Sequence, residues 1–227
     1  MTSRVSHLLF GGVAVTAALA VLFLPVLFAL TPAFAGKAAG VAACVGVCVE
    51  RAWAMYFRRG MRSACDGAGR DWTAIAVGYA YVLTLVVAAF EFLLRRVGLC
   101  GWWVLVGSAL YGAGVGLRYW AFHVLRNQWR VDVSDVSGER HLVQEGPYRY
   151  MRHPLYLGAC LAAIGLPVFL GAWGALAFGV LVFLPLEVIR AYYEERFLRD
   201  LFGTGYRNYA AQVWAFLPMP FKPGKLP

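Results

Sequence analysis

The chain has 227 residues, of which 61% are hydrophobic and only 15% are charged. Soluble globular domains carry a charge on about a quarter of their residues, so this composition argues against a soluble fold. The formal net charge is +9, and the cations gather at the ends of apolar runs. That placement indicates membrane topology and contact with anionic lipid headgroups, and it argues against a nucleic-acid partner.

About six apolar runs follow one another, each near the ~20 residues that a helix needs to cross the hydrocarbon core of a bilayer. They cover residues 7–30, 37–57, 73–94, 101–124, 154–171 and 173–189. The first is too long for the core of a secretion signal, although the "TPAFAG" after it resembles a cleavage site. The sequence therefore predicts an all-α, polytopic integral membrane protein with about five to six transmembrane helices.

The orientation in the membrane follows from three basic segments. They are the loop 58–72, the loop 126–153 and the tail from Arg190 onward. An even number of predicted spans separates them, so all three face the same side, and an excess of arginine and lysine marks that side as the cytosol. Arg95 and Arg96 fall on the other side and oppose this assignment. We expect both termini in the cytosol, in a bacterial inner membrane or the endoplasmic reticulum.

The last two apolar runs are joined only through "LGAWG", which predicts a tight helical hairpin. A tight hairpin returns both of its ends to the same face of the membrane. Polar residues concentrate in two stretches, 140–156 and 187–207, and these flank the hairpin in the sequence. We therefore predict a site at the cytosolic interface, built from both ends of one helix pair.

The residues at these two ends suggest how such a site is made. Gly146–Pro147 predicts a turn, and Pro154 suits the first turn of a helix, which places His153 near its N-cap. On the returning helix, Arg190 and Glu194 are spaced i, i+4 and share a face. Such a pair at a lipid boundary suits a zwitterion or a charged substrate. An ordinary juxtamembrane helix with interfacial aromatic residues explains the same composition, and the residues alone leave both interpretations open.

Other motifs in the chain favour structural interpretations. Gly112, Gly114 and Gly116 do not follow a predicted strand, so they fail as a dinucleotide loop, and Gly112 with Gly116 suits close helix packing. Cys44 and Cys48 lie one helical turn apart, but no second pair completes a zinc site. We expect no metal.

Two charged positions lie within or near the ends of apolar runs. For Glu91, near Arg95, snorkelling or a local ion pair is favoured over catalysis. Arg118 lies about two turns inside the end of its run, where a charge is costly unless it faces a cavity. A packing role and a role beside the site are equally open for Arg118.

Three segments together carry a resemblance to a known family. They are "GLRYWAFHVLRNQWRVDV", "RHLVQEGPYRYMRHPLYLGA" and "RAYYEERFLRDLFGTGYRNYAAQVWAFLP". They resemble the isoprenylcysteine carboxyl methyltransferase family, which belongs with the membrane phospholipid N-methyltransferases. The resemblance covers residues 114–218, nearly half of the chain. Its combined motif, GPYRYxRHPxY followed by R-x3-EE-x2-L-x3-FG-x2-Y, is highly specific.

The resemblance implies an S-adenosylmethionine-dependent methyltransferase embedded in the membrane as a single domain of residues 1–227. Residues 126–227 would form the catalytic half, with the cofactor in a pocket that opens to the cytosol. Residues 1–125 would supply the transmembrane helices that shape a tunnel for the substrate. The implied substrate is a lipidic small molecule or a prenylated cysteine, which enters from the membrane lipids.

The same resemblance assigns roles to individual residues. Cofactor contacts are implied for His141, Leu142, Val143, Tyr148, His153, Pro154, Tyr156 and Glu194. Glu194 would hold the ammonium group of the cofactor, and Arg190 would bind the substrate and orient an anionic acceptor. Arg190, Glu194 and His153 together are the implied catalytic residues.

Several alternatives remain beside carboxyl O-methylation. One is phosphatidylethanolamine-type N-methylation, another is methylation of an alkylated pyrone or phenol, and a third is an NADPH-dependent sterol-type reductase. A membrane scaffold or transporter is the non-enzymatic alternative. A carboxylate acceptor is already ionised at neutral pH and needs no general base, whereas a phenol or amine must lose a proton. In that second case His153 or Glu195 would matter more.

Overall fold

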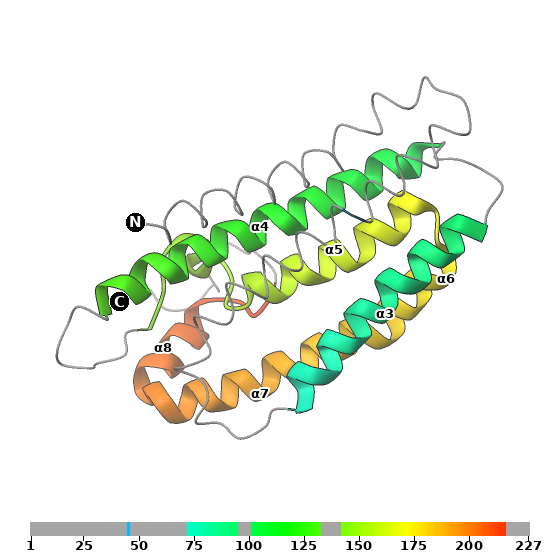
Figure 1. The fold of residues 1–227 in the computed structure, drawn as a ribbon. Coiled ribbons are helices and arrows are strands. Elements are labelled where there is room, and N and C mark those ends of the chain that lie inside the picture. Colours follow the sequence, from blue (N-terminus) through cyan, green and yellow to red (C-terminus); the bar gives the residue numbers. More distant parts are fainter. Residues whose placement is uncertain (1–44, 46–71, 95–100, 133–141, 217–227) are drawn as a thin grey trace, which may run out of the picture. The chain divides into compact units, whose positions relative to one another are not determined.

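The computed structural model describes residue 45 and residues 72–94, 101–132 and 142–216. The predicted spans 7–30 and 37–57 lie outside this part of the chain, apart from Val45. The elements are α3 (Trp72–Leu94), α4 (Trp102–Asp132), the 3-10 turn η1 (Gly146–Arg149), α5 (Pro154–Leu170), α6 (Trp173–Phe178), the π-helical η2 (Gly179–Phe183), α7 (Leu184–Phe202) and α8 (Thr204–Gln212) (Figure 1). The described residues form no strand beyond one isolated bridge between Met151 and Trp214, which confirms the all-α prediction for this part.

One described helix is long and apolar enough to cross a membrane by length and composition. It runs from Trp173 to Phe202 through α6, η2 and α7, and two shorter apolar helices cover Ala76–Phe92 and Pro154–Leu170. The number of crossings therefore stays a prediction. The run that was expected to end at residue 189 continues as helix to Phe202, and the run expected to end at residue 124 continues to Asp132. Both continuations are polar, so apolar length alone could not find them.

The described residues divide into two compact units. The first contains α3, α6, η2, the start of α4 and the end of α5. The second contains the remainder of α4, η1, the start of α5, nearly all of α7, and α8. Every described residue that the sequence analysis placed in the site belongs to the second unit.

In the first unit, α3 packs along α6 and η2. Tyr81 of α3 meets the ring of Phe183 edge-on, with 5.3 Å between the ring centroids. At the other end of α3, Glu91 Oε2 accepts hydrogen bonds from the backbone N–H groups of Gly174 (3.0 Å) and Ala175 (3.2 Å). These groups begin α6 and have no partner within the helix, so Glu91 caps it and its charge opposes the helix dipole.

Within the same unit, α4 and α5 approach each other so closely that glycine is required. A Cβ on Gly107 would lie 2.2 Å from the backbone nitrogen of Phe169, and one on Gly165 would lie 2.4 Å from that of Tyr111. Backbone atoms cannot yield, so any side chain here would push the helices apart. At Gly116, where the sequence predicted packing, no described atom lies within 4 Å of such a Cβ.

The long helix that leads from the hairpin to the site is not regular. Its residues Gly179–Phe183 form a π-helical turn, in which the backbone N–H of Leu184 reaches back to the carbonyl of Gly179. Pro185 follows at once and lacks the N–H that an α-helix would direct to the carbonyl of Leu181. The wider π-helical turn accommodates this missing N–H.

Candidate functional site

The approach to the site is a sharp turn at η1. Gly146 has a φ of +59°, the left-handed region that favours glycine, and a Cβ there would lie 2.6 Å from Val124 Cγ2. Pro147 opens the 3-10 turn and is buried together with Tyr148. The predicted turn is therefore present, and both its backbone conformation and its packing explain why the sequence reads Gly-Pro.

His153 stands directly before α5, as the sequence predicted. Its carbonyl accepts the hydrogen bond from the N–H of Leu157 (3.0 Å), and Pro154 occupies the first helical position, where a missing N–H costs nothing. The His153 ring is only 4% exposed. It stacks against Tyr156 with 5.4 Å between ring centroids, and it lies 5.5 Å from the ring centroid of Phe216.

We call the place where Arg152, His153 and the start of α5 meet α7 the corner. The chain after α8 is hydrogen-bonded to it through its backbone. The N–H of Arg152 donates to the carbonyl of Trp214 (2.8 Å), and the N–H of His153 donates to that of Ala215 (2.9 Å). Met151 pairs with Trp214 in the isolated bridge. Residues 214 and 215 therefore form one side of the corner, although they lie about sixty positions later in the chain.

Glu195 of α7 also binds the residues that precede α5. Its Oε1 accepts from Arg152 Nη2 at 2.6 Å and from His153 Nε2 at 3.1 Å. Its Oε2 accepts from Arg199 Nη2 at 3.0 Å, one helical turn later. The carboxylate is largely buried and both of its oxygens are occupied, so it stabilises the corner through charge-assisted hydrogen bonds.

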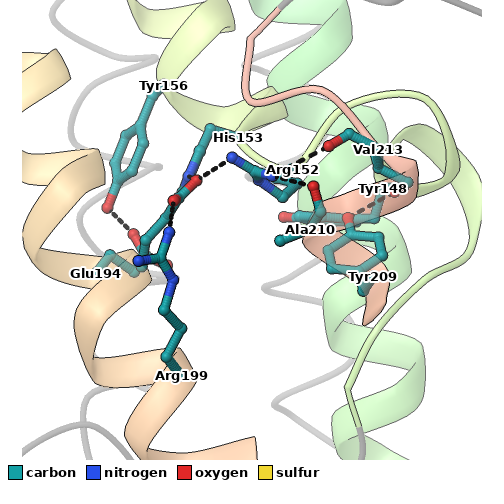
Figure 2. A network of polar contacts seen from close by, with 10 residues as sticks. Tyr148, Arg152, His153, Tyr156, Glu194, Arg199, Tyr209, Ala210 and Val213 are labelled. Carbon is teal, nitrogen blue, oxygen red and sulfur yellow. Dashed lines mark hydrogen bonds and ion pairs between the residues drawn. The ribbon is translucent and has the colours of Figure 1, made fainter. Parts of the chain in front are cut away.

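The neighbouring carboxylate, Glu194, points toward the start of α5. Tyr156 donates its phenolic hydrogen to Glu194 Oε2 (Figure 2). The guanidinium carbon of Arg190 lies 5.8 Å from the centroid of the Tyr156 ring, within the range of a cation–π contact. Arg190 and Glu194 therefore meet the same tyrosine, as expected for residues that share one face of α7. Unlike Glu195, Glu194 is exposed.

Buried tyrosines support the corner from α8. Tyr209 Oη donates to the carbonyl of Tyr148 (2.6 Å) and so ties α8 to η1. Burial raises the pKa of Tyr148 and of Tyr209 well above the ordinary value, and it raises the pKa of Tyr206 to about 12. These phenols therefore stay neutral over the physiological range, and Tyr209 acts as a hydrogen-bond donor. Leu142 packs against the cluster of Tyr206, Tyr209 and Val213.

The structure brings five of the predicted site residues together. His153, Pro154, Tyr156, Arg190 and Glu194 lie together at the corner between α5 and α7. Tyr148 and Leu142 lie behind them, in the packing with α8, and Val143 is half-buried next to Leu142. His141 lies outside the described residues. The roles of these residues toward a ligand stay a prediction.

Sequence reasoning missed Arg152 as a link between α8 and α7. It considered Glu195 only as a proton acceptor, whereas the structure ties Glu195 to two arginines and one histidine. The sequence signal that could have revealed this link is a pair of adjacent basic residues facing a pair of adjacent acidic residues. Arg152 and His153 are adjacent before α5, and Glu194 and Glu195 are adjacent on α7.

Arg118 of α4 also lies beside α5 and is only 6% exposed. A Cβ on Gly158 would lie 2.5 Å from Arg118 Cγ and 2.7 Å from the carbonyl oxygen of Gly114. The aliphatic part of Arg118 therefore fills the space that Gly158 leaves open, two residues after Tyr156. This placement gives Arg118 the packing role that the sequence left open and puts it close to the site residues of α5.

Comparison with known proteins finds relatives that match the part of the chain containing this site. The phospholipid methyltransferase family matches residues 102–205, which include α4, α5, α7 and the corner between them. Protein-S-isoprenylcysteine O-methyltransferase A of Arabidopsis thaliana is 31% identical over 154 residues, covering 61% of this chain and 73% of that protein. A probable protein-S-isoprenylcysteine O-methyltransferase of Oryza sativa subsp. indica is 31% identical over 160 residues, covering 64% of this chain and 80% of that protein.

A further relative, protein-S-isoprenylcysteine O-methyltransferase B of Arabidopsis thaliana, is 29% identical over 153 residues. No solved structure matches this chain. The family match and these relatives together define the class of the protein, a methyltransferase. The chain belongs to the isoprenylcysteine O-methyltransferase family.

Proposed function

We propose that the protein transfers a methyl group from S-adenosylmethionine to the carboxylate of a lipidic acceptor, such as a prenylated cysteine. The observation that carries this proposal is the meeting of Glu194, Tyr156 and Arg190 at one corner, in a chain of this family. The corner places an exposed carboxylate and a guanidinium on one face of α7. These are the charges that a zwitterionic donor and an anionic acceptor require.

The residues of the corner fit the amino-acid end of the donor. Glu194 supplies a carboxylate for the donor's ammonium group, and its hydrogen bond from Tyr156 fixes the direction in which that carboxylate points. The hydroxyl of Tyr206 is buried and has no hydrogen-bond partner among the described residues, so this tyrosine beside the corner retains unused donor capacity. When bound, S-adenosylmethionine supplies an electrophilic methyl group on a sulfonium.

Arg190 serves the acceptor. Methyl transfer is an in-line displacement, so the attacking oxygen must lie on the far side of the methyl carbon from the sulfur. A guanidinium can orient a carboxylate through paired hydrogen bonds and leave its charge in place. Orientation of this kind, together with exclusion of water, provides several kcal/mol of the reduction in the barrier.

The contacts of His153 favour a methyl acceptor that is already ionised. Its Nε2 is engaged with Glu195, and its ring is stacked on Tyr156 and lies against Phe216. A histidine held in this way is poorly placed to remove a proton from a phenol or an amine. A carboxylate needs no such base, which supports carboxyl O-methylation over the methylation of phenols or phospholipid amines.

We further propose that residues 126–227 form the donor-binding half on the cytosolic face, and that residues 1–125 shape the path of the acceptor from the bilayer. The exposed apolar side chains of α3 support contact with lipid tails. They are Tyr79, Val82, Leu83, Val86, Phe90 and Leu94. The protein would then be a multi-pass protein of a bacterial inner membrane or the endoplasmic reticulum.

The proposal is tested by label transfer. Purified protein in detergent receives S-adenosylmethionine with a tritiated methyl group, together with either a farnesylated cysteine analogue or phosphatidylethanolamine. We expect base-labile label, typical of a methyl ester, in the cysteine analogue, and none in an analogue whose carboxyl group is converted to an amide. Base-stable label in phosphatidylethanolamine would establish the N-methyltransferase alternative, and label in neither acceptor would contradict the proposed acceptor classes.

A further inference from the structure

We infer that Arg152 and Glu195 are positioning residues for the methyl donor. They hold Tyr156 and Glu194 in their working geometry without touching the substrate themselves. The inference rests on the proposed function and extends it to a network that joins the start of α5, the middle of α7 and the end of α8. It follows from three features of the contacts around Glu195.

The first feature is the fork of Arg152. Its Nη1 donates to the carbonyls of Ala210 (2.8 Å) and Val213 (3.1 Å), while its Nη2 pairs with Glu195 Oε1 (2.6 Å) (Figure 2). Both carbonyls belong to the end of α8, where backbone acceptors lack partners within the helix. One guanidinium therefore bridges the carboxylate of α7 and the negative end of α8 with two separate nitrogens, whereas a lysine carries all of its donors on one nitrogen.

The second feature distinguishes the two adjacent carboxylates. Each oxygen of Glu195 has a cationic or imidazole partner, and the side chains of Glu195 and Arg152 are each 11% exposed. Glu194 is exposed and its described hydrogen bond comes from a neutral phenol. Glu194 therefore has charge to offer a ligand, whereas the charge of Glu195 is already matched by its neighbours.

The third feature is the way these two carboxylates act together on α5. Glu195 binds His153 and Glu194 binds Tyr156, so consecutive residues of α7 hold both ends of the first turn of α5. The rings of His153 and Tyr156 stack on each other. If the hydrogen bond between Glu195 and His153 is lost, the stacked rings of His153 and Tyr156 can shift. Glu194, which is hydrogen-bonded to Tyr156, then moves with that ring.

The test compares donor affinity in variants of this network. In Arg152→Lys the charge is retained but the fork is lost, and in Glu195→Gln the size is retained but the charge is lost. We expect the KM for S-adenosylmethionine to rise about tenfold in Arg152→Lys and about fivefold in Glu195→Gln, because small displacements of positioning groups have large effects. The KM for the acceptor and the kcat should change by less than about threefold. The double variant should show much less than the product of the two effects, since both changes break one network.

Arg199→Gln is the matched control, because Arg199 also pairs with Glu195 but is half-exposed and reaches no other element in this network. Its KM for the donor should stay within about twofold of the wild type.

KM does not depend on how much of the enzyme is folded, so a merely structural role would reduce the yield of active protein and leave KM unchanged. Wild-type KM in both Arg152→Lys and Glu195→Gln would overturn the inference alone. Failure of the wild-type protein to bind S-adenosylmethionine would overturn the proposed function together with this inference.

Discussion

Replacing Glu194 by alanine is expected to abolish measurable binding of S-adenosylmethionine. The change removes the exposed carboxylate that we assign to the donor's ammonium group, and it leaves the phenol of Tyr156 without its acceptor. Loss of this charge-assisted contact should weaken binding at least about a hundredfold, or about 2.8 kcal/mol. Isothermal titration calorimetry with the purified protein measures this directly.

Two variants separate the causes of that loss. Glu194→Gln retains a hydrogen-bond acceptor for Tyr156 and removes only the charge, so its affinity should fall by about tenfold, between the wild type and alanine. Asp200→Ala removes another exposed carboxylate from α7 and should bind the donor normally. Retention of wild-type affinity in Glu194→Ala would show that this carboxylate does not hold the donor.

Replacing Arg190 by alanine is expected to spare donor binding and to reduce turnover about 10²- to 10³-fold, the range seen when a charge-stabilising group is lost. The guanidinium lies over the Tyr156 ring on the same face of α7 as Glu194. In the proposed function it orients the acceptor, so its removal leaves the donor contacts intact. Calorimetry with S-adenosylmethionine and steady-state kinetics with a prenylated cysteine analogue measure the two effects separately.

Arg196→Ala provides the comparison for Arg190, because Arg196 is an exposed arginine of α7 that lies over the ring of Tyr192. Its turnover should remain within about twofold of the wild type, as expected for an exposed charge. Arg190→Lys should recover part of the activity, since it retains the charge but loses the planar fork. Wild-type turnover in Arg190→Ala would assign Arg190 a structural role.

Much of the corner could be predicted because its signals are local. Gly146–Pro147 requires a turn, Pro154 begins a helix, and the i, i+4 spacing of Arg190 and Glu194 places them on one face wherever α7 lies. The short connection between the last two apolar runs then predicted that both ends would meet. The contact between Tyr156 and Glu194 bears out that prediction.

What the sequence did not predict depends on distant contacts or on polar helices. The link of Arg152 to Ala210 and Val213 requires α8 to fold back onto the corner, and no local pattern specifies that return. The apolar pattern ends at residue 189 and the i, i+4 pair extends the predicted helix only to Glu194, whereas α7 continues to Phe202 through charged residues. The cap that Glu91 provides for α6 likewise joins positions about eighty residues apart.

In the proposed function, the start of α5 and the Glu194 region of α7 together enclose a methyl donor. Ultraviolet cross-linking of tritiated S-adenosylmethionine to the purified protein, followed by mass-spectrometric mapping of the labelled peptides, tests it most directly. We expect label within residues 142–156 and 187–199, with competition by unlabelled donor. Competed label confined to α3 or to the first half of α4, with none in those two segments, would contradict the site proposed for this methyltransferase.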